Sequence, residues 1–261
     1  MSRRDTWSDH LGLCSVTLRH LSAQDVIGVT RAAGLRGIEW GADVHVPPSD
    51  PGRVAEVREL TRAAGLTVAS YGSYWRAGSS PMPDLRAVVQ TGSTLGAPRV
   101  RVWAGALGTE AADDPTRDAV VAALREGCVM ARDHDLQLAL EFHPNTLTDS
   151  VDGTLELLER VGDSGLQTYW QPRLDEETEP SVEGLRRLVP VLAGIHVFSW
   201  WPAANRLRLS ERADLWSAVA SLLTSEAEPC DLLLEFVRGD DPDLVSEEAS
   251  TLRDLFAAAR P

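Results

Sequence analysis

Four apolar segments in the second half of the chain each carry one polar side chain at a position where chemistry is expected. Glu141, His196 and Glu235 interrupt apolar runs, and Gln171 directly follows one. Burying a single charge costs on the order of several kcal/mol unless a cation, a partner or a proton compensates it. These four residues are therefore the first candidates for a functional site.

The four side chains offer donor atoms that suit a divalent metal ion. Two carboxylates, an imidazole and an amide oxygen together favour Mn²⁺ or Mg²⁺, with Co²⁺ or Zn²⁺ as alternatives. Two negative ligands balance one dication and leave coordination positions for substrate oxygens. We therefore predict a metal site formed by Glu141, Gln171, His196 and Glu235. The alternative is that Glu141 pairs with Arg101 and His196 only forms a hydrogen bond in the core.

The elements that must position these residues are strand-like segments that alternate with amphipathic helical stretches. Because side chains alternate between the faces of a strand, Ile195 and Val197 face one side and His196 faces the other. Eight such strands indicate a closed parallel barrel with its chemistry at the carboxyl ends of the strands. An open doubly wound sheet is the alternative, but no GxGxxG follows any predicted strand. The sequence thus predicts an α/β fold, a single (β/α)8 TIM barrel domain over residues 1–261. The predicted strands are 11–18, 37–41, 66–71, 99–103, 137–142, 166–170, 194–198 and 232–236.

Local signals mark the beginnings of helices and a repeated design. Ser22 with Asp25 resembles a capping arrangement at the start of the first helix. Asp114 followed by Pro115 is expected to cap a later helix. The segment RAAGL ends one helical stretch and recurs at the end of the next, which indicates consecutive units of one repeat.

The charge balance and the absence of lysine exclude several functions. Asp and Glu number 39 against 25 basic residues, which gives a net charge of −14. Nucleic-acid binding depends on basic patches that neutralise phosphates, so nucleic acid is not an expected partner. All the basic residues are arginine. Schiff-base aldolases, pyridoxal phosphate enzymes and P-loop NTPases all need a lysine amine and are therefore excluded.

The sequence also predicts where the protein is found. No apolar run approaches the roughly 20 residues of a membrane span, and the first five residues lack the apolar stretch of a secretory signal. Cys14, Cys128 and Cys230 are far apart and odd in number, which favours a reducing compartment over a disulfide framework. We expect a cytoplasmic protein without a membrane partner, with Cys14 and Cys230 as inert core thiols.

Aromatic and histidine side chains gather near the predicted strand ends, which favours a small organic ligand over a macromolecule. Indole faces stack on the C–H faces of sugars and exclude water. The alternatives are packing beneath loops for the tryptophans and exposed loop positions for the histidines. Glu39 and Arg101 point inwards and are expected to form a buried pair, while His20 is expected to be structural. The predicted substrate-binding residues are His45, Trp103, His143, Trp170, Trp200 and Arg206.

Four short motifs resemble one known family over nearly the whole chain. They are Leu140-Glu141-Phe142-His143, Tyr169-Trp170-Gln171-Pro172, Ile195-His196-Val197 and Leu234-Glu235-Phe236. These motifs are similar to those of the xylose isomerase-like TIM barrels, the sugar phosphate isomerase/epimerase superfamily that includes endonuclease IV. In its ketose epimerases, Glu, Asp, His and Glu hold a metal at the strand ends. The resemblance implies metal ligation by Glu141, His196 and Glu235, and an acid/base role for Glu141 and Glu235.

The chain departs from the ketose epimerases at three positions. Gln171 stands where they have a metal-ligating Asp, and Leu174 stands where they have a substrate-binding His. Pro202 stands where they have an Arg, although Arg206 follows closely. These departures weaken the assignment as a ketohexose epimerase but leave the resemblance to a metal-centred barrel intact.

The leading functional prediction is an enzyme of carbohydrate metabolism. We expect a metal-dependent isomerase or epimerase that acts on a sugar or other polyhydroxy carbonyl compound through a metal-stabilised enediolate. One alternative is a lyase or dehydratase that uses the same enolate chemistry on an oxidised sugar or glycoside. Another is a non-catalytic sugar-binding barrel, which Gln171 favours. An endonuclease IV-type enzyme is disfavoured because this chain lacks the many His and Asp metal ligands of that class and has a net charge of −14. A homo-oligomer is compatible with the sequence.

Overall fold

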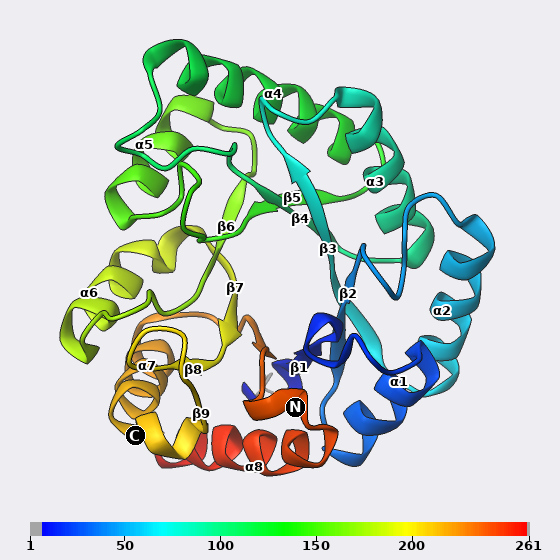
Figure 1. The fold of residues 1–261 in the computed structure, drawn as a ribbon, viewed down its shortest axis with the longest axis vertical. Coiled ribbons are helices and arrows are strands. Elements are labelled where there is room, and N and C mark those ends of the chain that lie inside the picture. The colour runs from blue at the N-terminus through cyan, green and yellow to red at the C-terminus, as the bar shows by residue number, and fades with distance from the viewer. Residues whose placement is uncertain (1–6, 260–261) are drawn as a thin grey trace, which may run out of the picture. The chain divides into compact units, whose positions relative to one another are not determined.

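Eight parallel strands and eight helices form a TIM barrel in the computed structural model, which describes residues 7–259 (Figure 1). The strand order around the closed barrel is β1-β10-β7-β6-β5-β4-β3-β2, which confirms the predicted fold class. The barrel strands are β1 (Leu11–Cys14), β2 (Gly37–Gly41), β3 (Thr67–Arg76), β4 (Arg99–Trp103), β5 (Gln137–Leu140), β6 (Gln167–Trp170), β7 (Leu192–Val197) and β10 (Asp231–Leu234). The helices are α1 (Ala23–Ala32), α2 (Pro51–Ala63), α3 (Met82–Leu95), α4 (Asp114–Arg132), α5 (Val151–Val161), α6 (Thr178–Leu188), α7 (Ala213–Glu226) and α8 (Pro242–Ala258).

Contacts among the described residues divide the chain into two compact units. Unit 1 comprises residues 7–39, Thr61–Thr67 and 170–259, and unit 2 comprises Trp40–Leu60 and Val68–Tyr169. The expectation of a single domain over residues 1–261 stays a prediction, and its two ends lie outside the described residues.

Unit 1 contains strands from both ends of the sequence. β1 pairs in parallel with β2 on one side and with β10 on the other, and β10 pairs with β7. In the helical layer α6 packs against α7, α7 against α8, and α8 against α1 (Figure 1). A short antiparallel hairpin, β8 (Ser199–Trp200) and β9 (Arg206–Leu207), follows β7. Strands from the two ends of the chain therefore lie next to each other in unit 1.

Gly12 allows β1 and β2 to approach closely. A Cβ atom at this position would lie 2.7 Å from the carbonyl oxygen of Gly37, so any larger residue would force the strands to shift. The same register pairs Gly12 with Gly37 and, two residues later, Cys14 with Glu39. The glycine thereby helps to hold Cys14 beside Glu39.

Unit 2 is a sheet of consecutive strands covered by consecutive helices. β3, β4, β5 and β6 pair in parallel in chain order. In the helical layer α4 packs against both α3 and α5. The register between β4 and β5 places Arg101 opposite Ala139 and Val102 opposite Leu140. The residue that follows β5 therefore lies near the end of β4.

Two predicted strands differ from the structure by four or five residues at their carboxyl ends, more than the other six do. β1 ends at Cys14, and Ser15–Leu18 forms a 3-10 turn. There the Thr17 hydroxyl accepts a hydrogen bond from the backbone N–H of Phe236 at 3.0 Å, a side-chain partner outside the strand ladder. β3 continues beyond Tyr71 to Arg76, where the chain stays largely buried. The Ser73 hydroxyl donates to the carbonyl of Arg101 at 2.7 Å and ties this extension to β4.

Helix starts follow the expected cap chemistry with one correction. The Ser22 hydroxyl accepts a hydrogen bond from the N–H of Asp25 at 3.2 Å, which confirms the first cap. The cap of α4 is Asp113 rather than Asp114, because Asp113 has extended backbone angles while Asp114 is the first helical residue. Asp113 accepts a hydrogen bond from the N–H of Thr116 at 3.0 Å. Hydrogen bonds from Thr116 lower the pKa of the Asp113 carboxyl.

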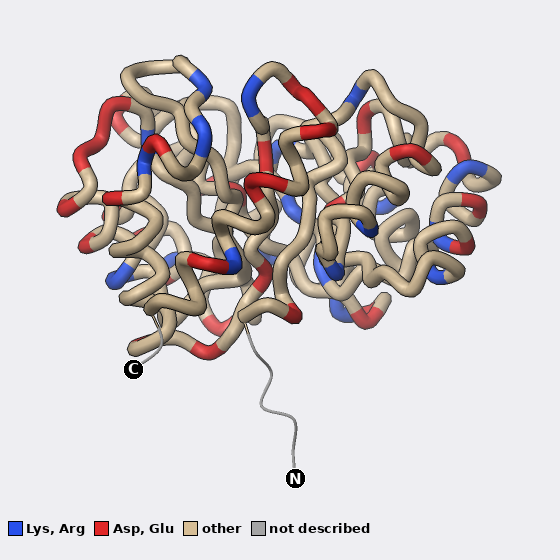
Figure 2. The backbone as a smooth tube through the Cα atoms, turned by 90° about the horizontal axis from the view of Figure 1, so that it is seen from below, with Lys and Arg blue, Asp and Glu red and all other residues tan. Residues whose placement is uncertain are grey.

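Charged residues are distributed along the helices and connecting loops of each unit. Figure 2 shows Asp and Glu along the chain with Arg interspersed among them. Within residues 7–259, no helix combines the length and the apolar character needed to cross a membrane. The expectations about nucleic-acid and membrane partners stay predictions.

Candidate functional site

His196 is the residue around which the predicted ligands of unit 1 gather. It lies on β7 between Ile195 and Val197, and its side chain is fully buried. Alternation along the strand turns the two aliphatic side chains to the opposite face. A neutral imidazole has one N–H donor and one lone pair, so its two nitrogens can serve different partners.

Gln171 and Glu235 lie on the Nδ1 side of His196. Gln171 Oε1 is 3.1 Å from Nδ1, and Glu235 Oε2 is 3.7 Å from it. Gln171 directly follows β6 and Glu235 directly follows β10. The register of Leu234 with Val197, and a 3.0 Å hydrogen bond from the Glu235 N–H to the Val197 carbonyl, fix the glutamate beside the histidine. The structure thus brings together three of the four predicted metal ligands.

Glu39 and Cys14 lie on the Nε2 side of the same ring. Glu39 Oε2 is 3.5 Å from His196 Nε2, and the Cys14 thiol donates to Glu39 Oε1 at a distance of 3.9 Å. One donor atom from each of the three residues lies within 4.8 Å of the other two, and all three residues are buried. This group of a thiol, a carboxylate and an imidazole is a candidate metal site.

Sequence reasoning missed this second group. Glu39 was expected to pair with Arg101, a prediction that stays open, and Cys14 was expected to be an inert core thiol. One signal was present in the sequence, because Glu39 interrupts an apolar strand just as Glu141 does. The position of Cys14 opposite Glu39 depends on the strand register, which no sequence motif indicates.

Glu141, the fourth predicted ligand, belongs to unit 2. It directly follows β5, and its Oε2 forms a buried ion pair with Arg101 Nη1 and accepts a hydrogen bond from Trp103 Nε1. The alternative that Glu141 pairs with Arg101 is therefore what the structure contains. The Arg101 guanidinium compensates the negative charge, and the two donors on one oxygen orient the carboxylate. This arrangement suits a positioned acid/base group as well as a structural ion pair.

Trp103 and His143, both predicted to bind substrate, stack on each other in unit 2. Their ring centroids are 4.4 Å apart and their planes differ by 21°. The guanidinium carbon of Arg76 lies 3.8 Å from the centroid of the Trp103 ring, a cation–π contact that sequence reasoning missed. Burial lowers the pKa of the Arg76 guanidinium. Trp103 and His143 are only partly buried, so part of the stack faces solvent.

Two other predicted substrate-binding residues are buried. His45 is 1% exposed, and its ring lies 5.8 Å from that of Trp40 in an edge-on arrangement. Trp170 is also 1% exposed and contacts Trp216 edge-on at 6.4 Å. These contacts favour packing roles, and substrate binding by His45 and Trp170 stays a prediction.

The β8–β9 hairpin brings the last two predicted substrate residues together in unit 1. The guanidinium carbon of Arg206 is 5.4 Å from the centroid of Trp200 and 5.1 Å from that of Phe236. Arg206 Nη1 also pairs with Asp240 Oδ1 at 2.5 Å. This aromatic and basic cluster follows the carboxyl ends of β7 and β10, where barrels of this class place substrate loops.

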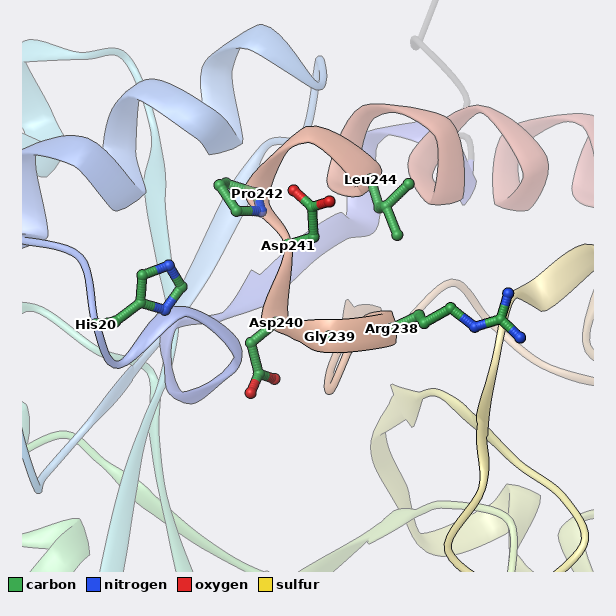
Figure 3. A pocket seen from close by; sticks show the side chains of 7 residues that line it. All are labelled: His20, Arg238, Gly239, Asp240, Asp241, Pro242 and Leu244. Carbon is green, nitrogen blue, oxygen red and sulfur yellow. The ribbon is translucent and has the colours of Figure 1, made fainter.

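A cavity of about 620 Å³ opens beside this cluster in unit 1. Its wall includes His20 of the segment between β1 and α1. The other lining residues follow β10 and are Arg238, Gly239, Asp240, Asp241, Pro242 and Leu244. Figure 3 shows His20 on one side of the cavity and Asp240 and Asp241 on the other. Asp240 is also the partner of Arg206. His20 was expected to be structural, so sequence reasoning did not indicate this cavity.

Comparison with known proteins identifies the family of this chain and a curated relative. The family model for xylose isomerase-like TIM barrels matches residues 27–172, more than half of the chain. A curated relative, the 3-dehydroshikimate dehydratase of Bacillus anthracis, is 25% identical over 227 residues. That alignment covers 80% of this chain and 78% of the relative.

Two solved structures have the same fold. A xylose isomerase-like TIM barrel protein from Mycobacterium smegmatis in complex with magnesium has a TM-score of 0.69 and 17% identity, covering 94% of this chain and 92% of that chain. The D-psicose 3-epimerase from Clostridium cellulolyticum H10 with D-tagatose has a TM-score of 0.72 and 15% identity, covering 96% of this chain and 99% of that chain. On the strength of the family match and the barrel topology, this chain belongs to the xylose isomerase-like TIM barrel family.

Proposed function

We propose that the protein is a metal-dependent isomerase or epimerase of a sugar or another polyhydroxy carbonyl compound. One observation carries the proposal: the buried His196 imidazole in unit 1 has metal-ligand donors within 3.7 Å of both of its nitrogens. A buried histidine that served packing alone would need one acceptor for its ring N–H. It would not need two carboxylates, Glu39 and Glu235, beside its ring.

The donor set near His196 fits a divalent ion. On the Nδ1 side, Gln171 and Glu235 supply an amide oxygen and a carboxylate oxygen close to the ring nitrogen. With the ring proton on Nε2, these three residues would hold the ion, as the sequence predicts, and Glu141 stays a further predicted ligand. Once bound, the ion would polarise the substrate carbonyl and acidify the neighbouring C–H bond.

Proton transfer is assigned to the two glutamates that directly follow barrel strands. Glu235 is anchored by its backbone hydrogen bond to β7, and its carboxylate lies beside His196. Glu141 keeps the acid/base role that the family resemblance implies for it, with its carboxylate oriented by Arg101 and Trp103. A carboxylate fixed in this way loses little entropy when it takes or gives a proton.

A sugar-like substrate is supported by partly buried aromatic groups. The Trp103–His143 stack in unit 2 and the Trp200–Arg206 contact in unit 1 each combine a flat apolar face with polar hydrogen-bonding atoms. Such surfaces bind the C–H faces and the hydroxyl groups of sugars.

Dehydration is the second candidate activity. The curated Bacillus anthracis relative, 25% identical over 80% of this chain, is a 3-dehydroshikimate dehydratase. Elimination of water begins with the same proton abstraction beside a carbonyl, so the same ligands and the same glutamate would serve. Leu174 and Pro202, which replace the substrate residues of ketose epimerases, also favour this alternative.

The test is solvent-proton exchange by the metal-loaded protein in D₂O. With ketoses as substrates we expect deuterium at the carbon beside the carbonyl, and with 3-dehydroshikimate we look for a new ultraviolet absorbance from a conjugated product. Glu235→Gln should lower the exchange rate by about 100-fold or more, because general acid–base groups contribute roughly 10²–10⁴-fold. Glu183→Gln, an exposed carboxylate of α6 in the same unit, is the control.

The possible results separate the candidates. Exchange without new absorbance supports the isomerase or epimerase, and new absorbance supports the dehydratase. Exchange that survives Glu235→Gln contradicts the acid/base assignment. Metal and sugar binding without exchange in any substrate would replace both activities with a non-catalytic sugar-binding barrel.

A further inference from the structure

We propose that Cys14, Glu39 and His196 Nε2 form a metal site of their own that selects a thiophilic ion such as Zn²⁺ or Co²⁺ over Mg²⁺. The site lies on the opposite side of the imidazole from Gln171 and Glu235. A neutral imidazole has one lone pair, so this site and the Nδ1-side group of Gln171 and Glu235 are alternative positions for one ion. The inference rests on the proposed function only in that both place a metal ion at His196.

The three donors lie somewhat farther apart than ligands around a tetrahedral ion, with one atom of each within 4.8 Å of the other two. Zinc bonds of about 2.3 Å to sulfur and about 2.0–2.2 Å to nitrogen or oxygen place neighbouring ligand atoms roughly 3.4–3.6 Å apart. His196 Nε2 and Glu39 Oε2 are 3.5 Å apart, and Cys14 Sγ and Glu39 Oε1 are 3.9 Å apart. Side-chain rotations would have to bring the thiolate, one Glu39 oxygen and Nε2 onto one ion.

The partner of the other ring nitrogen decides which nitrogen can act as a metal ligand. Gln171 Oε1, 3.1 Å from Nδ1, accepts a hydrogen bond when the ring proton is on Nδ1. In that tautomer the Nε2 lone pair points towards the side of the ring where Glu39 lies. A metal-bound histidine commonly donates its second N–H to a carbonyl or carboxylate, which fixes the ring and raises its basicity.

Charge and burial favour this ligand set for a dication. A thiolate and a carboxylate carry two negative charges, whereas Gln171 and Glu235 on the other side carry one between them. Cys14, Glu39 and His196 are 0%, 1% and 0% exposed, so a bound ion would be shielded from bulk water. Three protein ligands are also the number that catalytic zinc sites use, with a fourth position for water or substrate.

The thiolate determines which metal is preferred. Mg²⁺ takes oxygen ligands and demands near-octahedral geometry, while Zn²⁺ and Co²⁺ accept sulfur and nitrogen in a tetrahedral site. The strands that carry Cys14 and Glu39 are held in register by the close approach at Gly12. The thiol proton is released to solvent when the metal binds.

The experiment is a cobalt titration of chelator-treated full-length protein, followed by absorption spectroscopy. A Co²⁺–thiolate bond gives a near-ultraviolet charge-transfer band that oxygen and nitrogen ligands do not give. We expect this band in the wild type and its loss in Cys14→Ser. Cys128→Ser, which alters another buried thiol, should keep the band and serves as the matched control. Zn²⁺ affinity should fall by about 100-fold or more in Cys14→Ser. The loss of a direct ligand should cost at least as much as the roughly 10–100-fold that follows from mutating a residue that only hydrogen-bonds to a ligand.

A second measurement does not depend on any variant. X-ray absorption of the zinc-loaded wild type should show one sulfur neighbour at about 2.3 Å. Cobalt binding without the band, weakened by Glu235→Gln and not by Cys14→Ser, would place the ion on the Nδ1 side and overturn this inference while the proposed function survives. Failure to bind any metal overturns both. A charge-transfer band in a protein that catalyses no exchange supports this site and contradicts the proposed activity.

Discussion

The Arg101–Glu141 ion pair in unit 2 has side chains only 3% and 7% exposed. Forming such a pair in the interior gains little net stability, because the desolvation of both ions offsets their attraction. Breaking it is different, since the remaining charge stays buried without compensation. The pair is therefore better understood as a device that orients Glu141 than as a source of stability.

Arg101→Met should destabilise the protein by about 3–5 kcal/mol, the usual consequence of leaving one buried ion of a pair. The free energy of unfolding measured with urea checks this value. Arg101→Met combined with Glu141→Leu should recover a substantial part of the loss, because the second change removes the uncompensated carboxylate. A single-variant loss below about 1 kcal/mol would show that Glu141 is solvated or protonated in the folded protein.

Single polar residues within apolar runs were sufficient to find most of the candidate site. Gln171, His196 and Glu235 lie together, as their positions at neighbouring strand ends predicted. Cys14 was missed because cysteine is among the most buried residues whether or not it binds metal. Only its register with Glu39 distinguishes it from an ordinary core thiol.

At the scale of elements, helix α8 carries a buried carboxylate that binds the start of a neighbouring segment. Glu248 Oε2 accepts a hydrogen bond from the Leu209 N–H at 2.8 Å, and the side chain is 4% exposed. Burial raises the pKa of Glu248, with added repulsion from Glu247 and Glu211, against the opposing effect of the Leu209 hydrogen bond. The folded protein therefore binds this proton more tightly than the unfolded chain does.

Glu248→Gln should stabilise the protein relative to the wild type at neutral pH, with the difference vanishing at low pH. The stability linked to a raised carboxyl pKa is present below the unfolded pKa and is lost as pH rises through the folded value. The glutamine keeps an oxygen that accepts the Leu209 N–H and removes the buried charge. Urea unfolding at pH 4 and pH 8 measures the difference. Glu248→Ala, which loses the acceptor, is the comparison and should be destabilising at both values.

The ends of elements were predicted less well than their order. Each of the eight barrel strands overlaps a predicted strand, because apolar runs between helices indicate buried parallel strands. β1 is shorter because side-chain hydroxyls provide hydrogen-bond partners outside the sheet, and β3 is longer because burial continues past Tyr71. These differences come from contacts between distant segments, which local propensity does not contain.

For the whole molecule, metal binding should couple to stability. An ion that binds only the folded chain adds about 2.7 kcal/mol to the free energy of unfolding at 100 times its Kd. We expect chelator-treated protein to unfold at lower urea concentration than zinc-loaded protein. Cys14→Ser should lose most of this zinc-dependent gain, while Cys128→Ser should keep it. If the wild type unfolded at the same urea concentration with and without zinc, the result would contradict a metal site in the folded protein.

The sequence by itself determined the fold class, the family resemblance and the polar residues that follow the barrel strands, because hydrophobic periodicity and isolated buried charges are local properties of the chain. Only the tertiary structure decided which donors face each nitrogen of His196, that Glu141 is held by Arg101 and Trp103, and that Cys14 lies opposite Glu39. The physical reason is that register and ring orientation are set by backbone pairing between segments far apart in sequence. A displacement of one residue turns a side chain to the other face of its strand.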